Sequence, residues 1–293
     1  MASFELRPLS DAIGVEVIGI DLREPLKPDV VKAIEQAWYD HVIVLVRDQD
    51  LNLDQQHAYA ANFGKVAVRS QSSATEHEKK TSNTVMLITN VRENGNPIGT
   101  LPDGEMMFHS DTPYYEKPLK ATLLYAIDIP SRGGNTLFSN SYKAAETLPE
   151  DLKARIGNRK ALHIYDYGNQ NKTDDSYDKS VHPHFAHPVF RRHPETGRSA
   201  LFVSELMTEE ILGVSPKESK ELLQMLFEHQ RKQEFVYEHK WRPGDILMWD
   251  NRCSVHARTD FPSDERRMLR RITLEDEHPV LAGEPPTPET AAP

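Results

Sequence analysis

Four stretches of the chain show the periodicity or the boundary signals of α-helices. In segment 27–41 apolar residues recur at the spacing of a helix with one buried face. They are Val30, Val31, Ile34 and Trp38. The string LDQQHAYAANFG follows the capping residue Asn52 and stops at Gly64, which predicts a second helix. Two further helices are predicted over residues 142–156 and 216–233.

Between these helices the chain consists mostly of short apolar runs typical of β-strands. VIVLVRD is rich in β-branched residues and is typical of a buried strand. Further strands are predicted for VMLITNV, TLLYAIDI, ALFV, EFVYEH, DILMWD and MLRRITLED, with polar turns such as RPGD. The alternation of strand and helix that marks a doubly wound sheet is not apparent. The pattern therefore favours a mainly β fold with flanking helices, a sandwich or jelly roll.

The chain shows no internal repeat and no long internal linker, so residues 1–281 are predicted to form a single domain. Residues 282–293 contain the Pro-rich string GEPPTPETAAP and are predicted to be a flexible tail. Segment 168–179, GNQNKTDDSYDK, is polar and almost without apolar anchors. We expect an exposed loop there, and a lid over a site is one role for such a loop.

The charge balance limits the class of partner. With 35 Lys and Arg against 45 Asp and Glu, the net charge is −10. A field of this sign does not favour nucleic acid or an anionic membrane, so an anionic ligand must be held by locally placed Arg or Lys. The opening MASFELRPLS has no basic segment leading into an apolar one, and a cytoplasmic location is predicted. The single cysteine, Cys253, excludes a disulfide framework and a Cys-rich zinc site.

One histidine and one aspartate stand two residues apart in the string MMFHSDTPYYEKP. On an extended strand, the side chains of His109 and Asp111 would point to one face. A third ligand is predicted at His256, in WDNRCSVHARTD. Two histidines and a carboxylate occupy one face of an octahedral Fe(II) site and leave positions open for a chelating cosubstrate and dioxygen. The alternative for the first pair alone is a surface histidine hydrogen-bonded to a neighbouring aspartate.

A 2-oxoglutarate cosubstrate would leave its distal carboxylate to be neutralised by the protein. A planar guanidinium suits this task because it can pair with a carboxylate through two hydrogen bonds. Arg267 follows His256 on the next predicted strand, and Thr136 in SRGGNTLF would add a hydroxyl donor. On spacing alone, Arg267 could equally be a solvated charge in the basic run ERRMLRR.

Several strings resemble, in order and spacing, motifs of the taurine dioxygenase and 2,4-dichlorophenoxyacetate dioxygenase (TauD/TfdA) family. They are HSDTPY, SRGGNTLF, HPVFRRHPETGRSALFV, PGDILMWDNRCSVHARTDF and RRMLRRITL, and the opening IGVEVIGIDLREPL also looks like the family's first strands. The resemblance covers about residues 5–278. It implies a double-stranded β-helix (jelly-roll) core with helices outside, and an Fe(II)- and 2-oxoglutarate-dependent dioxygenase.

The resemblance also implies roles for particular residues. The implied iron ligands are His109, Asp111 and His256, and the implied binders of the distal carboxylate of 2-oxoglutarate are Thr136 and Arg267. In taurine enzymes an arginine four residues further on grips the anionic group of the substrate, and the matching residue is Arg271. Strand alternation places Arg267 and Arg271 on one face and turns Arg270 away.

Three predicted substrate-binding positions depart from the family pattern. Phe108 precedes the first ligand where the family usually has Trp, and it keeps an aromatic wall. Arg69 stands approximately where taurine enzymes have a sulfonate-binding His, and Glu105 stands where they have an Asn. These changes argue against taurine itself as the substrate.

The sequence therefore predicts a dioxygenase that hydroxylates a small anionic substrate and releases succinate and CO2. The substrate classes that fit are sulfonates, sulfate esters, aryloxyalkanoates and other carboxylates. One alternative is a metal-dependent cupin-type hydrolase or isomerase with the same ligands, which would have no reason to retain Thr136 and Arg267. Another is a non-catalytic jelly-roll binding protein, against which the ligand triad argues. We expect a homo-oligomer, because family members commonly form one, and no nucleic-acid or membrane partner.

Overall fold

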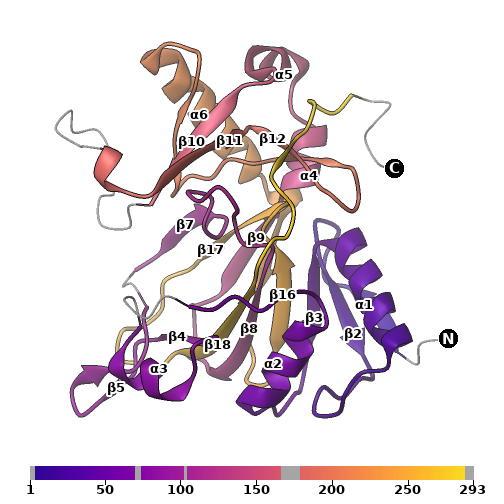
Figure 1. The fold of residues 1–293 in the computed structure, drawn as a ribbon, viewed down its shortest axis with the longest axis vertical. Coiled ribbons are helices and arrows are strands. Elements are labelled where there is room, and N and C mark those ends of the chain that lie inside the picture. The colour runs from indigo at the N-terminus through magenta and orange to yellow at the C-terminus, as the bar shows by residue number, and fades with distance from the viewer. Residues whose placement is uncertain (1–3, 70–73, 102–103, 166–178, 288–293) are drawn as a thin grey trace.

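The computed structural model describes residues 4–69, 74–101, 104–165 and 179–287, and two β-sheets form its main body (Figure 1). The larger sheet has the strand order β1 (Glu5–Pro8), β2 (Val15–Ile18), β3 (Ile43–Val46), β16 (Ile246–Asp250), β8 (Ala121–Asp128), β18 (Met268–Leu274) and β4 (Met86–Thr89). The smaller sheet has the order β15 (Val236–His239), β9 (Thr136–Asn140), β17 (Ser254–Arg258) and β7 (Met106–His109). Within these two sheets, only β2 and β3 pair in parallel.

The central strands β3, β16 and β8 of the larger sheet are buried on both faces, which explains their continuous apolar runs. Along β3, Val44 and Val46 belong to one core cluster, and Ile43 and Leu45 belong to another. The second cluster also contains Phe138 of β9, so it lies between the two sheets. The predicted mainly β fold of the jelly-roll type, with flanking helices, is confirmed.

Helices and smaller strand groups surround this body. The helices are α1 (Pro28–His41), α2 (Leu53–Ala61), α3 (Glu76–Thr81), α4 (Ser141–Glu146), α5 (Glu150–Ile156) and α6 (Pro216–Gln230), with 3-10 turns at Lys179–Val181 and Gln233–Phe235. The smaller strand groups are β11 (His184–Pro188), β10 (Lys160–Ile164) and β14 (Thr208–Ile211); β13 (Ser199–Leu201), β12 (Phe190–Arg192) and β19 (Leu281–Ala282); and the hairpin of β5 (Arg92–Glu93) and β6 (Asn96–Pro97). In Figure 1, α4, α5 and α6 lie together with β10, β11 and β12 above the sheets.

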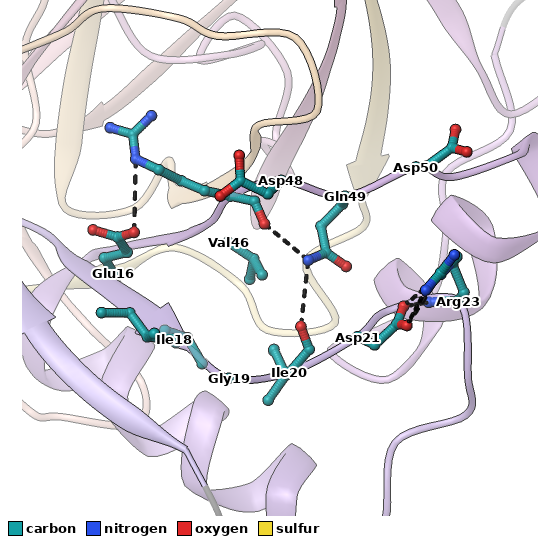
Figure 2. A pocket seen from close by; sticks show the side chains of 12 residues that line it. Glu16, Ile18, Gly19, Ile20, Asp21, Arg23, Val46, Asp48, Gln49 and Asp50 are labelled. Atoms are coloured by element: carbon teal, nitrogen blue, oxygen red, sulfur yellow. Dashed lines mark hydrogen bonds and ion pairs between the residues drawn. The ribbon is translucent and has the colours of Figure 1, made fainter.

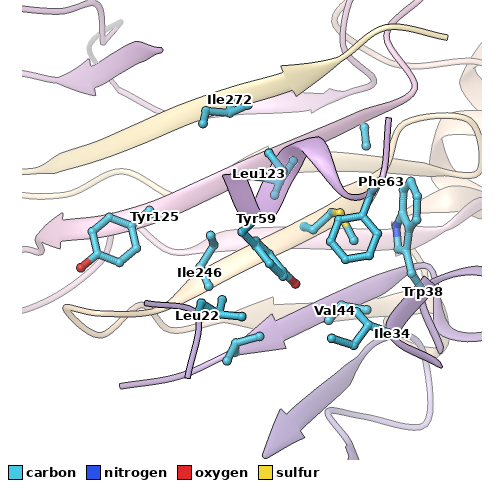
Figure 3. Close-up of a cluster of buried hydrophobic side chains, with 14 of the residues drawn as sticks. Leu22, Ile34, Trp38, Val44, Tyr59, Phe63, Leu123, Tyr125, Ile246 and Ile272 are labelled. Carbon is cyan, nitrogen blue, oxygen red and sulfur yellow. The ribbon is translucent and has the colours of Figure 1, made fainter. Parts of the chain in front are cut away.

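Two helices, α1 and α2, cover the face of the larger sheet that points away from the smaller sheet. Figure 3 shows Trp38 of α1, Tyr59 of α2 and Phe63 packed against the strands in one apolar cluster. Asn52 begins α2 with a capping box, because its side chain accepts a hydrogen bond from Gln55 N and the Gln55 side chain accepts one from Asn52 N. Both helices agree with the sequence prediction.

The segment predicted as a single helix over 142–156 forms two helices, α4 and α5. Pro149 is the N-cap residue of α5 and marks the break. Proline has no backbone N–H and disfavours the helical conformation of the residue before it, so a continuous helix cannot pass through this position.

The structure describes the start of the predicted tail, but only the last residue of the predicted lid. The domain boundary at residue 281 lies inside β19, and Lys153 Nζ donates a hydrogen bond to Pro286 O at 2.6 Å, so part of the predicted tail contacts α5. The predicted lid, 168–179, lies outside the described residues except for Lys179. Within the described ranges, no helix combines the length and the apolarity that crossing a membrane would require.

Candidate active site

The three predicted metal ligands converge in the structure. His109, Asp111 and His256 each offer one ligand atom within 4.8 Å of the other two. The two imidazole rings have centroids 4.1 Å apart. The residues come from β7, from the turn after it and from β17, which are neighbours in the smaller sheet. Two imidazoles and one carboxylate on one side of a common point suit a divalent iron ion with open positions.

The electrostatics of the site favour the protonation states that a metal needs. Burial lowers the pKa of both imidazoles, and the neighbouring His109 ring lowers the pKa of His256 further. Burial alone would raise the pKa of Asp111, but the Arg271 guanidinium and the two histidines hold it well below its usual range. At neutral pH the rings are therefore neutral and the carboxylate is ionised. His109 Nδ1 lies 2.9 Å from Met107 O, which leaves Nε2 as its ligand atom.

Asp111 lies just beyond the end of β7 at His109, so the strand itself does not fix its position. Hydrogen bonds from neighbouring residues hold its side chain and backbone. The hydroxyl of Thr122, on β8, donates to Asp111 Oδ2. Asn251 Nδ2 donates to Thr122 Oγ1 at 3.0 Å, and Asn251 Oδ1 accepts from Asp111 N at 3.3 Å. These supporting residues could not be predicted from the sequence, because the Asn251 contact joins positions 140 residues apart.

A β-bulge in β7 decides which of its side chains reach the site. His109 lies opposite His256, but the next pair across the two strands is Met106 with Arg258. Two residues of β7 therefore face one residue of β17. This allows both Met106 and His109 to line the cavity described below, whereas Phe108 is not among the residues that line it. The lining of the cavity therefore does not support the predicted contact of Phe108 with the substrate.

A cavity of about 290 Å³ lies beside the metal ligands, between the two sheets. Its apolar wall is formed by Met86, Ile88, Leu101, Met106, Leu124, Tyr165, Trp249 and Ala257. The charged residues that line it, among those that the structure describes, are Asp111, Arg258, Arg267 and Arg271. The cavity therefore combines an apolar wall with an excess of positive charge.

The predicted anchors of the cosubstrate, Thr136 and Arg267, both line this cavity. Arg267 is 1% exposed, and its Nη1 has no hydrogen-bond partner in the described part of the chain. Its Nε donates to Gly134 O at 3.2 Å; Gly134 has a φ of +63°, and a Cβ there would lie 3.1 Å from Arg267 Nε. Thr136 Oγ1 accepts a hydrogen bond from Trp241 Nε1 at 3.0 Å, which leaves its own hydrogen to donate. A buried guanidinium with an unused N–H beside a hydroxyl fits a carboxylate ligand.

The two arginines of β18 point to opposite faces of the strand, as alternation predicts. Arg271 lines the cavity, and its Nη2 lies 2.8 Å from Asp111 Oδ2. Arg270 faces the helix side, where it donates to Leu51 O and its guanidinium carbon lies 4.6 Å from the ring centroid of Tyr125. Arg271 is thus placed beside the metal ligands, and Arg270 has a structural role.

Arg258 lines the cavity and was not predicted from the sequence. It follows the ligand His256 by two residues on β17, so strand alternation puts both side chains on one face. Strand alternation, which links His109 with Asp111 in the sequence, also links His256 with Arg258 and is the signal that identifies this arginine.

The other two predicted substrate contacts lie away from the cavity. Arg69 Nη1 is 2.6 Å from Oε1 of Glu78, a buried carboxylate in α3 that also accepts from Leu87 N at 2.8 Å. Glu105 is exposed, and neither Arg69 nor Glu105 lines the cavity. The positive charge of Arg69 is neutralised within its own segment, so its predicted role at the substrate is corrected.

A second hollow, of about 380 Å³, lies beside β2 and β3 and is lined mainly by polar groups (Figure 2). Its arginine Arg23 is paired with Asp21 at 2.6 Å, and the Gln49 side-chain amide donates to Ile20 O and Arg47 O. None of its residues belongs to the metal-ligand groups found in the described ranges. The cavity between the sheets is therefore the site to which chemistry can be assigned.

Comparison with known proteins agrees with this site. The model of the family described as "Taurine catabolism dioxygenase TauD, TfdA family" matches residues 5–273. Pentalenolactone F synthase of Streptomyces avermitilis is 33% identical, across 96% of this chain and 96% of that protein. The alpha-ketoglutarate-dependent 2,4-dichlorophenoxyacetate dioxygenase of Cupriavidus pinatubonensis is 31% identical, across 92% of this chain and 97% of that protein.

Solved structures show the same relationship. A putative alpha-ketoglutarate-dependent taurine dioxygenase from Burkholderia xenovorans superimposes with a TM-score of 0.79 and 30% identity, covering 97% of this chain and all (100%) of that one. AAD-2, in complex with Mn(II) and N-oxalylglycine, gives a TM-score of 0.78 with 28% identity, covering 95% of this chain and 100% of that one.

The fold, the His–Asp–His cluster and the buried arginine lead to the same conclusion as these relatives. The hydrolase or isomerase alternative is not favoured, because the relatives are named as dioxygenases. The chain belongs to the TauD/TfdA family and is an Fe(II)- and 2-oxoglutarate-dependent dioxygenase.

Proposed function

We propose that this dioxygenase hydroxylates a small organic anion with an apolar body and releases succinate and CO2. Sulfonates, sulfate esters, aryloxyalkanoates and other carboxylates fit this description. In this proposal His109, Asp111 and His256 hold Fe(II), Thr136 and Arg267 bind the distal carboxylate of 2-oxoglutarate, and Arg271 binds the anionic group of the substrate.

The charge balance of the cavity carries the proposal. Three guanidinium groups line it, and among the described residues that line it the single carboxylate is that of Asp111. One carboxylate and the dianion 2-oxoglutarate do not neutralise three guanidinium groups and a divalent ion. Buried charge that is left uncompensated is costly, so the cavity favours a further anion. The whole molecule carries a net charge of −10, and this local excess of positive charge is therefore a property of the site.

The apolar wall of the cavity supports the proposal that the substrate has an apolar body. Met86, Ile88, Leu101, Met106 and Tyr165 would surround the part of a ligand that extends away from Arg271. A ligand that fills such a wall gains about 25 cal/mol for each Å² of apolar surface buried. A small polar substrate such as taurine would leave most of this wall uncovered. The name of the 2,4-dichlorophenoxyacetate dioxygenase relative describes an anion with an apolar body, which is consistent with this reading.

The chain itself would position and protect the reacting groups. Bound Fe(II), with 2-oxoglutarate and dioxygen, supplies the oxidant, and 2-oxoglutarate leaves as succinate and CO2. Arg271 lies 2.8 Å from Asp111, so an anion bound there would hold its nearest carbon atoms beside the metal ligands. The apolar residues of the wall exclude water from that carbon.

The test is a measurement of succinate. Protein is loaded with Fe(II) under anaerobic conditions, mixed with 2-oxoglutarate and exposed to air with each of five compounds: an alkanesulfonate, an alkyl sulfate, an aryloxyalkanoate, an apolar monocarboxylate and the methyl ester of the aryloxyalkanoate. We expect succinate to rise with at least one anion and not with the neutral ester. Asp111→Ala and Arg267→Ala should abolish the rise. Arg266→Ala is the matched control, because Arg266 is exposed and paired with Asp128 at the surface.

Two outcomes would contradict the proposal. Equal stimulation by the ester and the parent acid would show that the anionic group is not recognised. An absence of succinate with every compound, from protein shown to hold iron, would remove the proposed reaction. We also propose that the chain forms a homo-oligomer, because family members commonly do, and light scattering after size-exclusion chromatography tests this independently.

A further inference from the structure

Arg258 has a position in the cavity that the roles above do not use. It lies directly opposite Thr136 in the register of β17 and β9, so the two side chains leave the same face of the smaller sheet. Residues opposite each other in antiparallel strands have Cβ atoms about 4.5–5.5 Å apart. Thr136 is one of the two proposed anchors of the distal carboxylate. Arg258 is therefore a close neighbour of that anchor.

The second anchor also interacts with Arg258. Burial first, and then the positive charge of Arg258, lower the pKa of Arg267 to about 9, so Arg267 remains charged at neutral pH. Arg267 and Arg258 are 1% and 7% exposed. Among the described residues that line the cavity, the one carboxylate, that of Asp111, is paired with Arg271. Two buried guanidinium groups at one end of a cavity form a binding site for an anion.

Contacts with the cavity wall fix the orientation of Arg258. Its Nη2 donates to Gly104 O, just before β7, and its guanidinium carbon lies 5.9 Å from the ring centroid of Phe261. A guanidinium held in this way needs little reorganisation to bind a planar carboxylate, so less conformational entropy is lost on binding.

We propose that Arg258 is a second cationic binding residue for the distal carboxylate of 2-oxoglutarate, acting together with Arg267 and Thr136. This inference rests on the proposed function, since it takes the ligand at this end of the cavity to be the cosubstrate. It assigns to the cosubstrate a charge that would otherwise be available to the substrate, and it leaves Arg271 as the substrate's cation.

The experiment measures binding by calorimetry, on the full chain loaded with Mn(II) and kept free of oxygen. Two 2-oxo acids serve as probes: 2-oxoglutarate, and 2-oxopentanoate, which has a methyl group where 2-oxoglutarate has its distal carboxylate. The variants are Arg258→Gln, which removes the charge but keeps a polar N–H donor, and Arg258→Lys, which keeps the charge. Arg266→Gln is the matched control on the surface.

We expect Arg258→Gln to weaken 2-oxoglutarate binding by about 10- to 100-fold, the usual effect of losing a hydrogen bond between charged groups. Binding of 2-oxopentanoate should change by less than about twofold, because it has no charge for Arg258 to bind. Arg258→Lys should recover part of the loss, and Arg266→Gln should behave as the unmodified protein does.

Three results would overturn the inference. Equal losses for both 2-oxo acids would show that Arg258 only maintains the cavity wall. Unchanged 2-oxoglutarate binding, with a raised KM for the organic substrate, would move Arg258 to the substrate. Failure of the unmodified protein to bind 2-oxoglutarate would overturn the proposed function and, with it, this inference; the first two results leave the proposed function intact. Circular dichroism and the melting temperature of each variant identify any loss of folding.

Discussion

At the scale of single residues, the Asp111 carboxylate is the group on which most contacts of the site converge. Its Oδ2 accepts from the Thr122 hydroxyl and lies 2.8 Å from Arg271 Nη2. Both contacts are made to the same oxygen atom, so we expect Oδ1 to be the atom that binds the metal. Replacing residues that orient a ligand in this way typically lowers metal affinity by about 10- to 100-fold.

The Thr122 hydroxyl is therefore predicted to tune metal binding. Thr122→Val keeps the shape of the side chain but removes the donor to Asp111 Oδ2, and we expect Mn(II) affinity to fall by about 10- to 100-fold. Calorimetric titration of the metal-free protein with Mn(II) measures this affinity. Thr122→Ser keeps the hydroxyl and should bind metal nearly as well as the unmodified protein. Equal affinity of the valine and serine variants would show that the hydrogen bond has no such role.

Arg271 is predicted to act on the substrate and not on the cosubstrate. Arg271→Met removes the cation beside Asp111, and we expect the KM of an anionic substrate to rise by about 10- to 100-fold, in line with the loss of a charged hydrogen bond. The Kd of 2-oxoglutarate should stay within about threefold, a change of less than 1 kcal/mol. Steady-state succinate formation gives the first quantity and binding to the Mn(II)-loaded protein gives the second. A large change in the Kd with an unchanged KM would reverse the assignment.

At the scale of elements, the turn between β16 and β17 sets the direction of the strand that bears His256. Asp250 ends β16, and its carboxylate receives Arg252 Nη2 at 2.7 Å and His193 Nε2 at 3.0 Å. Arg252 is fully buried and also contacts Glu195 at 2.9 Å. This network joins the turn to the loop after β12. His193, Asp250 and Cys253 also form a second group of potential metal ligands, in which the Asp250 carboxylate is paired with the Arg252 guanidinium.

Removing the charge of Asp250 is predicted to destabilise the protein. Asp250→Asn leaves the Arg252 guanidinium buried without its main partner, which typically costs about 3–5 kcal/mol. The control is Asp128→Asn, since the Asp128–Arg266 pair is largely solvent-exposed and is expected to contribute at most about 1 kcal/mol. Urea unfolding at neutral pH compares the two variants. A loss for Asp250→Asn no larger than that for Asp128→Asn would contradict the importance of the network.

The same carboxylate gives a pH dependence of defined sign. Burial raises the pKa of Asp250, but Arg252 and His193 outweigh it and hold the pKa well below its usual range. The stabilisation is therefore present at pH values above the unfolded pKa of about 3.9 and is lost as the pH falls through the lower, folded pKa. The difference in unfolding free energy between the unmodified protein and Asp250→Asn should be constant from about pH 8 to pH 5 and should shrink only in stronger acid.

Local patterns in the sequence predict individual helices and strands better than they predict strand register and the contacts between distant elements. The capping box at Asn52 and the apolar runs of the larger sheet are signals within a few residues, and the structure agrees with them. The bulge that brings Met106 into the cavity beside His109 depends on the register of β7 against β17, which no local pattern specifies. The same holds for Arg69: its pairing with Glu78 comes from the position of a short helix, whereas its family match was only approximate.

At the scale of the whole molecule, the site connects the two sheets. The ligands His109 and His256 belong to the smaller sheet, and Arg267, a proposed anchor of the cosubstrate, directly precedes β18 of the larger one. The metal would therefore contact residues of the smaller sheet, and the cosubstrate bound to it would add a contact to the start of β18 in the larger sheet. Any ligand that binds only the folded state adds RT ln(1 + [L]/Kd) to the unfolding free energy.

Metal and cosubstrate are accordingly predicted to stabilise the fold cooperatively. At about 100 times Kd, mass action adds about 2.7 kcal/mol, which for a chain of this length raises Tm by about 5 °C. We expect that rise when Mn(II) and N-oxalylglycine are present together, a smaller one with Mn(II) alone, and almost none with N-oxalylglycine alone, because the chelating end of the ligand needs the metal. A chelator should reverse the effect, and Asp111→Ala should not show it. Equal shifts from N-oxalylglycine with and without metal would mean that the arginines bind it as a simple anion, and the bridge between the sheets would not depend on the metal.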